Sequence, residues 1–190
     1  QDRGFINVKF RTLFKKLSIS IGAILLIFVS ALSALAVSAR FTDGPSVIFA
    51  GGPLEAGELV TGPEPDWGFA REINLIELQL LEPPRSRILW VADYEGKLYL
   101  NSNYMGGLRQ RLWKKWPGEA EKDGRAILRI DGKRYERQLV RIKTGDAIEG
   151  VTQEFTRKYG VTMTPEEVEK EELWLFELAP PRTSGSGVIR

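Results

Sequence analysis

A run of 23 residues without a charged side chain, residues 17–39, constrains this chain more than any other feature of its sequence. At about 1.5 Å per residue, a helix of that length spans the roughly 30 Å hydrocarbon core of a bilayer. A signal peptide is the alternative, because Val37-Ser38-Ala39 has the small residues of a cleavage site. The apolar part of a signal peptide covers only about 7–15 residues, however. The run therefore predicts a transmembrane helix over residues 17–39.

Basic residues lie almost entirely on the N-terminal side of this run. Residues 1–40 hold six Lys or Arg and one acidic residue, and only Arg40 closely follows the run. The positive-inside rule then predicts a single-pass protein of the cytoplasmic (inner) membrane, with residues 1–16 as a cytoplasmic tail and the main domain in the periplasm. The expected partners of the helix are the lipid bilayer and other membrane protein subunits.

The composition excludes several classes of active site. The chain has no Cys and no His, so it cannot by itself build a serine–histidine triad, a thiolate nucleophile or a standard zinc site. No pair of carboxylates stands out as an acid and base, and we predict neither a catalytic residue nor a metal ligand. Residues 41–190 hold 21 basic and 24 acidic residues, which is not the balance of a nucleic-acid-binding protein.

Charge is unevenly distributed along the rest of the chain. Residues 85–143 carry fifteen Lys or Arg against seven acidic residues, and the segments on either side are acidic. Such a pattern suits either an anionic ligand or ion pairs within the protein. Ion pairs within the protein are the commoner cause, and we favour them here.

The remaining residues divide into three parts. Residues 40–70 are rich in Gly and Pro and predict an extended, irregular connector between the membrane and the domain. Residues 71–180 carry the strand and helix patterns of a folded domain. Residues 181–190 read as a flexible C-terminal tail, because they include the low-complexity run from Thr183 to Gly187.

The domain reads as mainly β (α+β). Glu95-Gly96 and Asp131-Gly132 each separate two apolar runs, as in two-residue hairpin loops. Six such runs suit a small closed barrel, and we predict a six-stranded split β-barrel with two or three short helices. The expected strands are residues 73–80, 88–94, 97–103, 125–130, 133–142 and 173–178. The expected helices are residues 108–116, stopped by Pro117-Gly118, residues 146–159, ended by Gly160, and a turn from Pro165 capped by Thr164.

Two stretches resemble a known family. Residues 84–90, PRSRILW, and residues 99–104, YLNSNY, resemble the core hairpin of the pyridoxamine 5′-phosphate oxidase-like split β-barrels. Residues 125–160 look like the deazaflavin-dependent nitroreductase branch of that family and its uncharacterised relatives. The resemblance covers about residues 71–180. It implies a barrel that holds flavin mononucleotide (FMN) or a deazaflavin in a groove, often between the two subunits of a homodimer.

The resemblance also implies a set of cofactor-binding residues. Arg87 matches the arginine that holds the cofactor phosphate, which suits the planar, two-pronged guanidinium. Ser102-Asn103-Tyr104 matches the polar stretch on the next strand. The candidate cofactor-binding residues are Arg85, Arg87, Ser102, Asn103, Tyr104 and Arg109.

The sequence departs from the family pattern at two places near this set. Val91-Ala92 stands where the family has a lysine, and Met105-Gly106-Gly107 stands where it has a Ser-Arg-Lys cluster. Most of the positive charge expected around a phosphate is therefore missing. Basic residues of the following segment could replace it: Arg109, Arg111, Lys114 and Lys115.

Three functions remain open on this basis. The first is a membrane-anchored, non-catalytic accessory subunit of a larger membrane complex, with no cofactor. The second is a membrane-anchored oxidoreductase that uses FMN or a deazaflavin. The third is a binding domain for haem, another tetrapyrrole or another anionic ligand. The sequence favours the first, because the phosphate site is depleted and a periplasmic domain has no access to the cytoplasmic reductants of this family.

Overall fold

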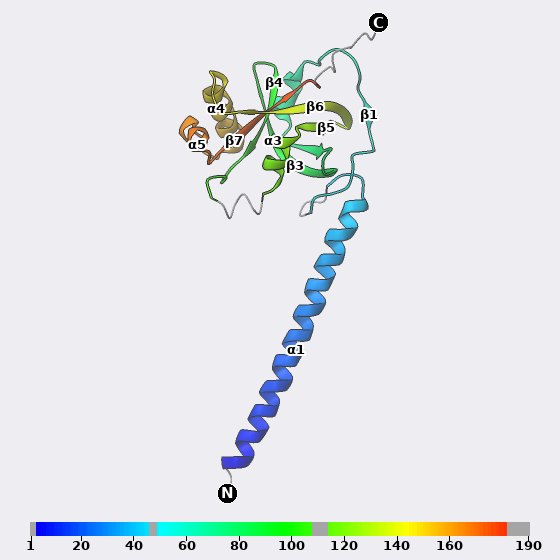
Figure 1. Cartoon of the computed structure of the whole chain (residues 1–190), viewed down its shortest axis with the longest axis vertical. Helices are drawn as coiled ribbons and strands as arrows, with labels where there is room; N and C mark the ends of the chain where they lie inside the picture. The colour runs from blue at the N-terminus through cyan, green and yellow to red at the C-terminus, as the bar shows by residue number, and fades with distance from the viewer. Residues whose placement is uncertain (1–2, 46–48, 108–113, 182–190) are drawn as a thin grey trace. The chain divides into compact units, whose positions relative to one another are not determined.

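The chain divides into two compact units, Gln1–Ala39 and Arg40–Arg190 (Figure 1). The computed structural model describes residues 3–45, 49–107 and 114–181, and only the backbone of residues 3–14. The first unit is one helix, α1 (Arg3–Ser38), followed by a short 3-10 turn, η1 (Ala39–Phe41). Helix α1 begins well before the apolar run, because residues 3–16 contain no proline that would interrupt it.

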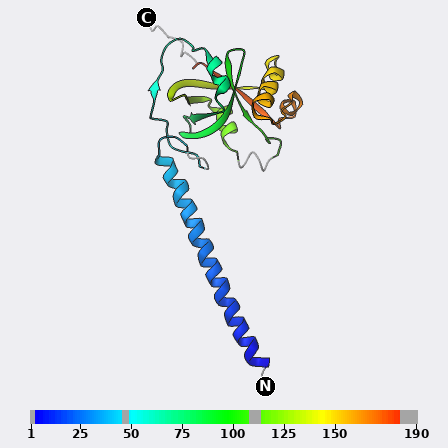
Figure 2. The same cartoon turned by 180° about the vertical axis from the view of Figure 1, so that it is seen from behind.

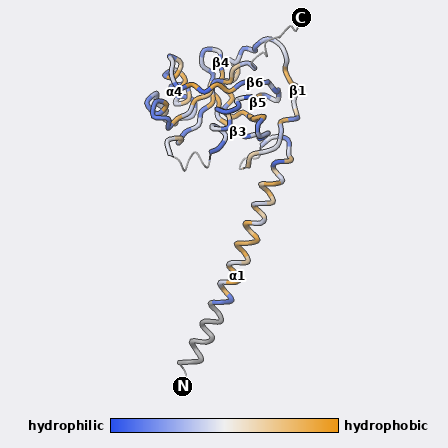
Figure 3. The backbone as a smooth tube through the Cα atoms, in the orientation of Figure 1, coloured by the Kyte–Doolittle hydropathy of each residue, from blue (hydrophilic) through white to orange (hydrophobic). Residues whose placement is uncertain are grey.

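One helical stretch, Lys15–Phe41, is long and apolar enough to cross a membrane. Its large apolar side chains are exposed within the unit, as a lipid-facing helix requires. Figure 3 shows apolar residues, in orange, along most of the described part of α1. The predicted single N-terminal membrane helix ahead of a barrel is thus present in the fold.

The second unit is a closed antiparallel barrel, which confirms the predicted fold class (Figure 1 and Figure 2). A two-residue strand, β1 (Glu58–Leu59), adds to it by pairing in parallel with the start of β6. The six barrel strands, in order around the barrel, are β2 (Leu75–Leu80), β3 (Arg85–Tyr94), β4 (Lys97–Ser102), β7 (Trp174–Ala179), β6 (Lys133–Ile142) and β5 (Arg125–Ile130).

Two ten-residue strands, β3 and β6, hold the barrel together by changing partners along their length. The first half of β3, residues 85–90, pairs with β2, and residues 91–94 pair with β4. In the same way, residues 133–138 of β6 pair with β5, and residues 138–142 pair with β7. The neighbours of each long strand diverge where the exchange occurs, so the barrel is split on two sides.

The two predicted hairpin turns have the backbone conformation that their sequences indicate. Glu95 and Gly96 have φ of 51° and 73°, and Asp131 and Gly132 have φ of 49° and 72°. Two consecutive residues with positive φ are the signature of a type I′ hairpin turn. Both two-residue hairpins predicted from the sequence are therefore confirmed.

One helix differs from its prediction. Residues 108–113 lie outside the described part of the chain, and the described helix here is α3 (Trp116–Lys122). The predicted stop at Pro117-Gly118 is wrong, because Pro117 lies in the first turn, where its missing N–H removes no helical hydrogen bond. The other helices are η2 (Trp67–Glu72), α4 (Ala147–Tyr159), which ends at a left-handed Gly160, and α5 (Pro165–Glu169), which begins with the capping box of Thr164 and Glu167.

The apolar side chains form two layers. The barrel interior holds residues such as Leu78, Leu100 and Leu128, all fully buried, together with the tryptophans of η2 and α3. The second layer lies outside the barrel, where α4 buries Val151 and Phe155 against β3, β4 and β7. Figure 2 shows α4 and α5 on one flank of the barrel, in yellow and orange.

The predicted connector is largely part of the barrel unit. Residues 42–45 and 49–57, named here the clamp, are bonded to β2, β3 and the β5–β6 hairpin. Gly51 N–H donates to Ser86 O at 3.0 Å, Ser86 N–H donates back to Gly51 O at 3.2 Å, and Ser86 Oγ donates to Gly52 O at 2.6 Å. The clamp thus pairs like a short strand with the edge of β3 that β4 leaves open.

Charged and amide side chains hold the rest of the clamp. The Arg129 guanidinium donates to both oxygens of Asp43, at 3.0 and 2.8 Å, and also pairs with Glu77. The Glu55 N–H, followed by Arg129, holds the pKa of Asp43 below its ordinary value. Leu54 N–H donates to Gln79 Oε1 at 2.7 Å. The clamp is therefore fastened at several separate points.

The partner exchange of β3 is stabilised by two side chains from the end of α4. Val91 N–H donates to the Tyr159 hydroxyl at 3.0 Å, and that hydroxyl lies 2.6 Å from Asn74 O. The Lys158 ammonium donates to the carbonyls of Ala70, Ile73 and Val91, at 2.6–2.9 Å. These groups replace the strand partners that β3 lacks at the exchange.

The role of the Tyr159 hydroxyl, at the point where β3 changes partners, predicts that its removal lowers stability. Tyr159→Phe leaves a backbone donor and a backbone acceptor without their partner, so we expect the free energy of unfolding to fall by about 1–3 kcal/mol. Thermal or denaturant unfolding of the full chain measures this change. The matched control is Tyr104→Phe, at a residue 72% exposed, which should change stability by less than about 0.5 kcal/mol. Equal effects of the two substitutions would contradict this role of Tyr159.

Candidate functional site

Arg87, the residue expected to hold a phosphate, points into the barrel. It pairs in register with Leu78 of the interior, and its side chain is only 16% exposed. The guanidinium lies 5.7 Å from the ring centre of Trp116 and 4.0 Å from a carboxylate oxygen of Glu119, both on α3. Burial lowers the pKa of Arg87 to about 10, and Glu119 opposes this shift. Arg87 therefore remains a cation at neutral pH, with its nearest anion supplied by the protein.

Arg85 and Ser86 occupy the same part of β3. Arg85 pairs in register with Leu80, and its charge adds to the lowering of the pKa of Arg87. Ser86 is fully buried under the clamp, and its N–H, carbonyl and hydroxyl all bond to Gly51 or Gly52. The polar groups of Ser86 are thus used by the fold.

The polar residues of the next strand are also engaged. Ser102 is 3% exposed, and its hydroxyl contacts the Met105 sulfur at 3.4 Å. The Asn103 side chain accepts from Asn101 Nδ2 at 2.8 Å, and its carbonyl accepts from Lys114 Nζ at 3.0 Å. Tyr104 is exposed, with a positive φ of 63°. Arg109, the last of the predicted residues, lies outside the described part of the chain.

The strand pairing explains why these residues do not form one cradle. The β3–β4 ladder covers residues 91–94 and 97–100, so Arg87 and Ser102 lie beyond its end, on strands that have already diverged. The fold places Trp116 and Glu119 of α3 next to Arg87. A flavin or deazaflavin phosphate would have to displace Glu119 from this position. The described members of the predicted set therefore do not form one cradle for the phosphate of such a cofactor.

The ring of a flavin would also need an open aromatic face. The indole of Trp90 is stacked on Tyr159, with ring centres 4.3 Å apart and planes 7° apart. Tyr159 in turn stacks on Phe155 of α4. One face of Trp90 is therefore already covered by the outer apolar layer.

Arginine–tryptophan contacts recur on the inner side of the two long strands. The guanidinium of Arg137 lies 4.7 Å from the ring centre of Trp67, and that of Arg141 lies 3.4 Å from that of Trp174. The side chains of Arg87, Arg137 and Arg141 are nearly buried. Within the described structure, the Nε–H group of each has no hydrogen-bond acceptor. Contact with an aromatic face stabilises such a cation even where a hydrogen bond is missing.

Acidic residues from the flanking segments complete the pairing of the basic middle segment. Glu64 accepts two bonds from Arg137, and Glu171 pairs with Arg141 at 3.3 Å. From the other end of the chain, Asp43 pairs with Arg129. Ion pairs within the protein, the favoured explanation of the uneven charge, are therefore confirmed. The sequence did not identify these individual partners, because they lie up to 86 residues apart.

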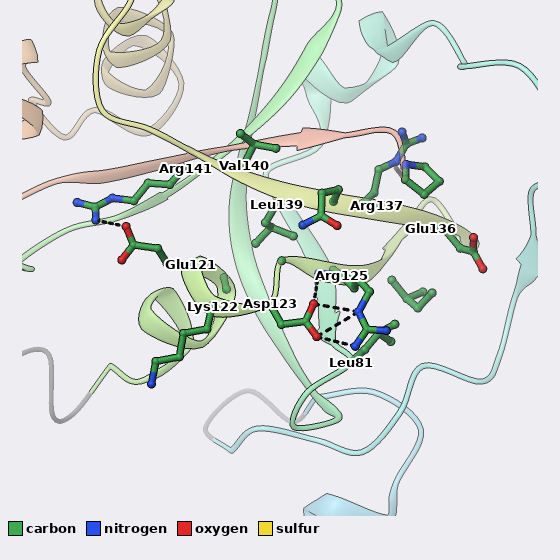
Figure 4. Close-up of a pocket in the computed structure, with 16 residues that line it drawn as sticks. Leu81, Glu121, Lys122, Asp123, Arg125, Glu136, Arg137, Leu139, Val140 and Arg141 are labelled. Atoms are coloured by element: carbon green, nitrogen blue, oxygen red, sulfur yellow. Dashed lines mark hydrogen bonds and ion pairs between the residues drawn. The ribbon is translucent and has the colours of Figure 1, made fainter. Parts of the chain in front are cut away.

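A cavity of about 630 Å³ lies on the barrel where α3 meets β5 and β6 (Figure 4). Its wall carries several charged groups, and four of them pair with one another. Asp123 and Arg125 form a two-pronged pair, and Glu121 accepts from Arg141 at 2.8 Å. Figure 4 shows both pairs lying along the wall. No group of acidic side chains in the described ranges, here or elsewhere, is arranged to hold a metal ion.

Comparisons with known proteins do not add a family or a relative. A scan against protein-family models finds no match to this sequence, and a search of curated proteins finds no similar sequence. The function is therefore argued from the geometry of the barrel and its anchor.

The contact between Arg87 and Glu119 predicts a coupled effect on stability. Glu119→Gln should lower the free energy of unfolding by about 1 kcal/mol, because it removes the anion nearest to a buried cation. In an Arg87→Met background the same change should cost close to nothing, because methionine fills the space without a charge. Denaturant unfolding of the wild type, the two single variants and the double variant measures the coupling. Additive effects would show that the two side chains do not depend on each other.

Proposed function

We propose that this protein is a membrane-anchored, non-catalytic accessory subunit of a larger membrane protein complex. One observation carries the proposal: Arg87, Ser102 and Asn103, three of the residues expected to bind a cofactor phosphate, are engaged with other groups of the barrel. Arg87 faces Trp116 and Glu119, Ser102 contacts Met105, and Asn103 accepts from Asn101 and Lys114. In this proposal, polar groups that a cofactor-binding split barrel would offer to its ligand stabilise the barrel itself.

The anchor supports a role inside a complex. The described residues of α1 include Ser18, Gly22 and Ser33, whose small side chains allow a neighbouring helix to approach closely. The basic residues before the apolar run favour an N-terminus in the cytoplasm and a barrel in the periplasm of a bacterial inner membrane. In this proposal α1 packs among the helices of the partner subunits, and the barrel contacts their extracytoplasmic surfaces.

The buried arginines of the barrel can be explained without a bound cofactor. An oxidoreductase or a tetrapyrrole-binding domain would use Arg87 or Arg141 as an anion-binding group. Each of these arginines already has a carboxylate and an indole as neighbours. We therefore expect no resident FMN, deazaflavin or haem, although an ordinary split-barrel enzyme remains the alternative outcome of the test.

The proposal is tested by extracting the full chain from its native membrane in a mild detergent. We expect other membrane subunits to co-migrate with it in fixed stoichiometry, as measured by mass spectrometry, with no chromophore bound to this chain. The matched control replaces residues 17–39 by an alternating Leu-Ala helix of the same length, which still spans the membrane but lacks the Ser and Gly positions. That variant should lose most of its partners. A lone wild-type protein, or one that carries a flavin, would contradict the proposal.

A further inference from the structure

A groove on the barrel unit, named here the acidic groove, lies between the end of η2, the end of β3 with its hairpin turn, and α4. It has a volume of about 610 Å³. Four acidic and two basic residues line it, so its net charge is −2. These charged residues are Glu72, Asp93, Glu95, Glu154, Arg71 and Arg157.

Ion pairs within the acidic groove neutralise only part of its negative charge. Arg157 donates to both oxygens of Glu154, at 2.8 and 2.6 Å. Among the residues whose side chains are described, no basic group pairs with Glu72 or Glu95. Both of these residues are exposed. The unpaired negative charge therefore lies where the groove meets solvent.

Asp93 has one carboxylate oxygen without a partner. Its side chain is 1% exposed, and its Oδ2 accepts from Arg71 Nε at 3.0 Å. Its Oδ1 is buried and, within the described structure, accepts no hydrogen bond. Such an oxygen is costly, so a donor that reaches it gains more than at an exposed carboxylate. Arg71 is 63% exposed, so its side chain can turn toward solvent and give access to Oδ1.

The wall of the groove next to Asp93 is formed by Tyr94, which packs against α4. A Cβ at Gly150 would lie 2.1 Å from the Tyr94 ring, so the ring occupies the space that a side chain on α4 would need. The charge of Glu95 raises the pKa of Tyr94, and Glu149 in the first turn of α4 adds to this shift. The negative field thus extends from the hairpin turn to the start of α4.

The acceptors of the groove suit an organic cation. No cluster of acidic groups in the described ranges could hold a metal ion. An ammonium or guanidinium instead uses separate acceptors, because each of its N–H groups donates in its own direction. Asp93 Oδ1 offers one acceptor, and Glu72 and Glu95 offer others nearer to solvent. A lysine or arginine side chain has an apolar stem long enough to bring its charge to a buried acceptor while its backbone stays outside.

We propose that the acidic groove is a docking surface of the barrel and that it receives a lysine or arginine side chain of a partner subunit. This inference rests on the proposed function, because it assigns a surface of the barrel to the contact with that subunit. Charge complementarity defines the partner, since the groove has exposed unpaired carboxylates and an unused buried acceptor. A buried charge-assisted contact with exposed charges around it is typical of an anchor residue in an interface.

Binding of a basic side chain is tested with the purified full chain in detergent at low ionic strength. The probe is fluorescein-labelled tetralysine, and its fluorescence anisotropy measures binding. We expect saturable binding to the wild type that weakens by about fivefold or more in Glu72→Gln/Glu95→Gln and in Asp93→Asn. The double variant changes only exposed residues, so it tests the groove independently of any effect of Asp93→Asn on folding.

The matched control is Glu58→Gln/Glu169→Gln, which removes two exposed carboxylates outside the groove. Its affinity for tetralysine should equal that of the wild type. Equal weakening in the two double variants, or no saturable binding to the wild type, would overturn the proposal. Tighter binding of free spermidine than of tetralysine would also overturn it, because the groove would then serve a small amine.

Docking on the partner is tested by extracting charge-reversed variants from the native membrane. Glu72→Lys/Glu95→Lys should lower the co-migrating subunits by about fivefold or more, because like charges then face one another. Glu58→Lys/Glu169→Lys should leave them unchanged. Full partner content in the first variant would overturn docking at the groove and leave the accessory-subunit function intact. A wild type without partners would overturn that function, and docking at the groove with it.

Discussion

The fold depends on the exchange of partners along β3 and β6. Each strand begins in one half of the barrel and ends in the other, so its backbone must leave one neighbour before it meets the next. Unpaired backbone groups in a buried position are costly. At Val91 the Tyr159 hydroxyl and the Lys158 ammonium supply the missing partners. Burial raises the pKa of Tyr159 to about 12, so its hydroxyl keeps the proton that it donates.

The splits that this exchange creates are filled by the chain itself. The clamp pairs with the open edge of β3 at Ser86, and α3 brings Trp116 into the inner core, where it packs on Phe176. Buried arginines on the long strands then meet tryptophans and carboxylates from distant segments. Residue types that would make a ligand site elsewhere serve here to hold the filled splits closed. This is the physical reason for preferring a scaffold to an enzyme.

Much of the fold could be predicted from the sequence because its signals are local. The Glu95-Gly96 and Asp131-Gly132 turns, the capping box at Thr164 and the apolar run of residues 17–39 each act within a few residues. The clamp could not be predicted in this way. Its residues look like a linker, and its bonds to Ser86 and Arg129 join segments that are 34 and 86 residues apart.

The candidate site was predicted less well, for a related reason. Arginine at position 87 suggests an anion, but only the tertiary structure shows whether that anion is a ligand or a carboxylate of the protein. The start of β3 at Arg85 rather than at residue 88 placed Arg87 in register with an interior leucine. Residues 108–113 lie outside the described part of the chain, so the role expected for Arg109 stays a prediction.

The most direct test of this account is a titration of FMN into the purified full chain in detergent, followed by flavin fluorescence anisotropy, with inorganic phosphate as competitor. If Arg87 serves the barrel, the wild type and the Arg87→Met variant will show the same absence of saturable binding. Saturable binding to the wild type that phosphate competes and Arg87→Met abolishes would show that the split still holds a cofactor, and would contradict the account.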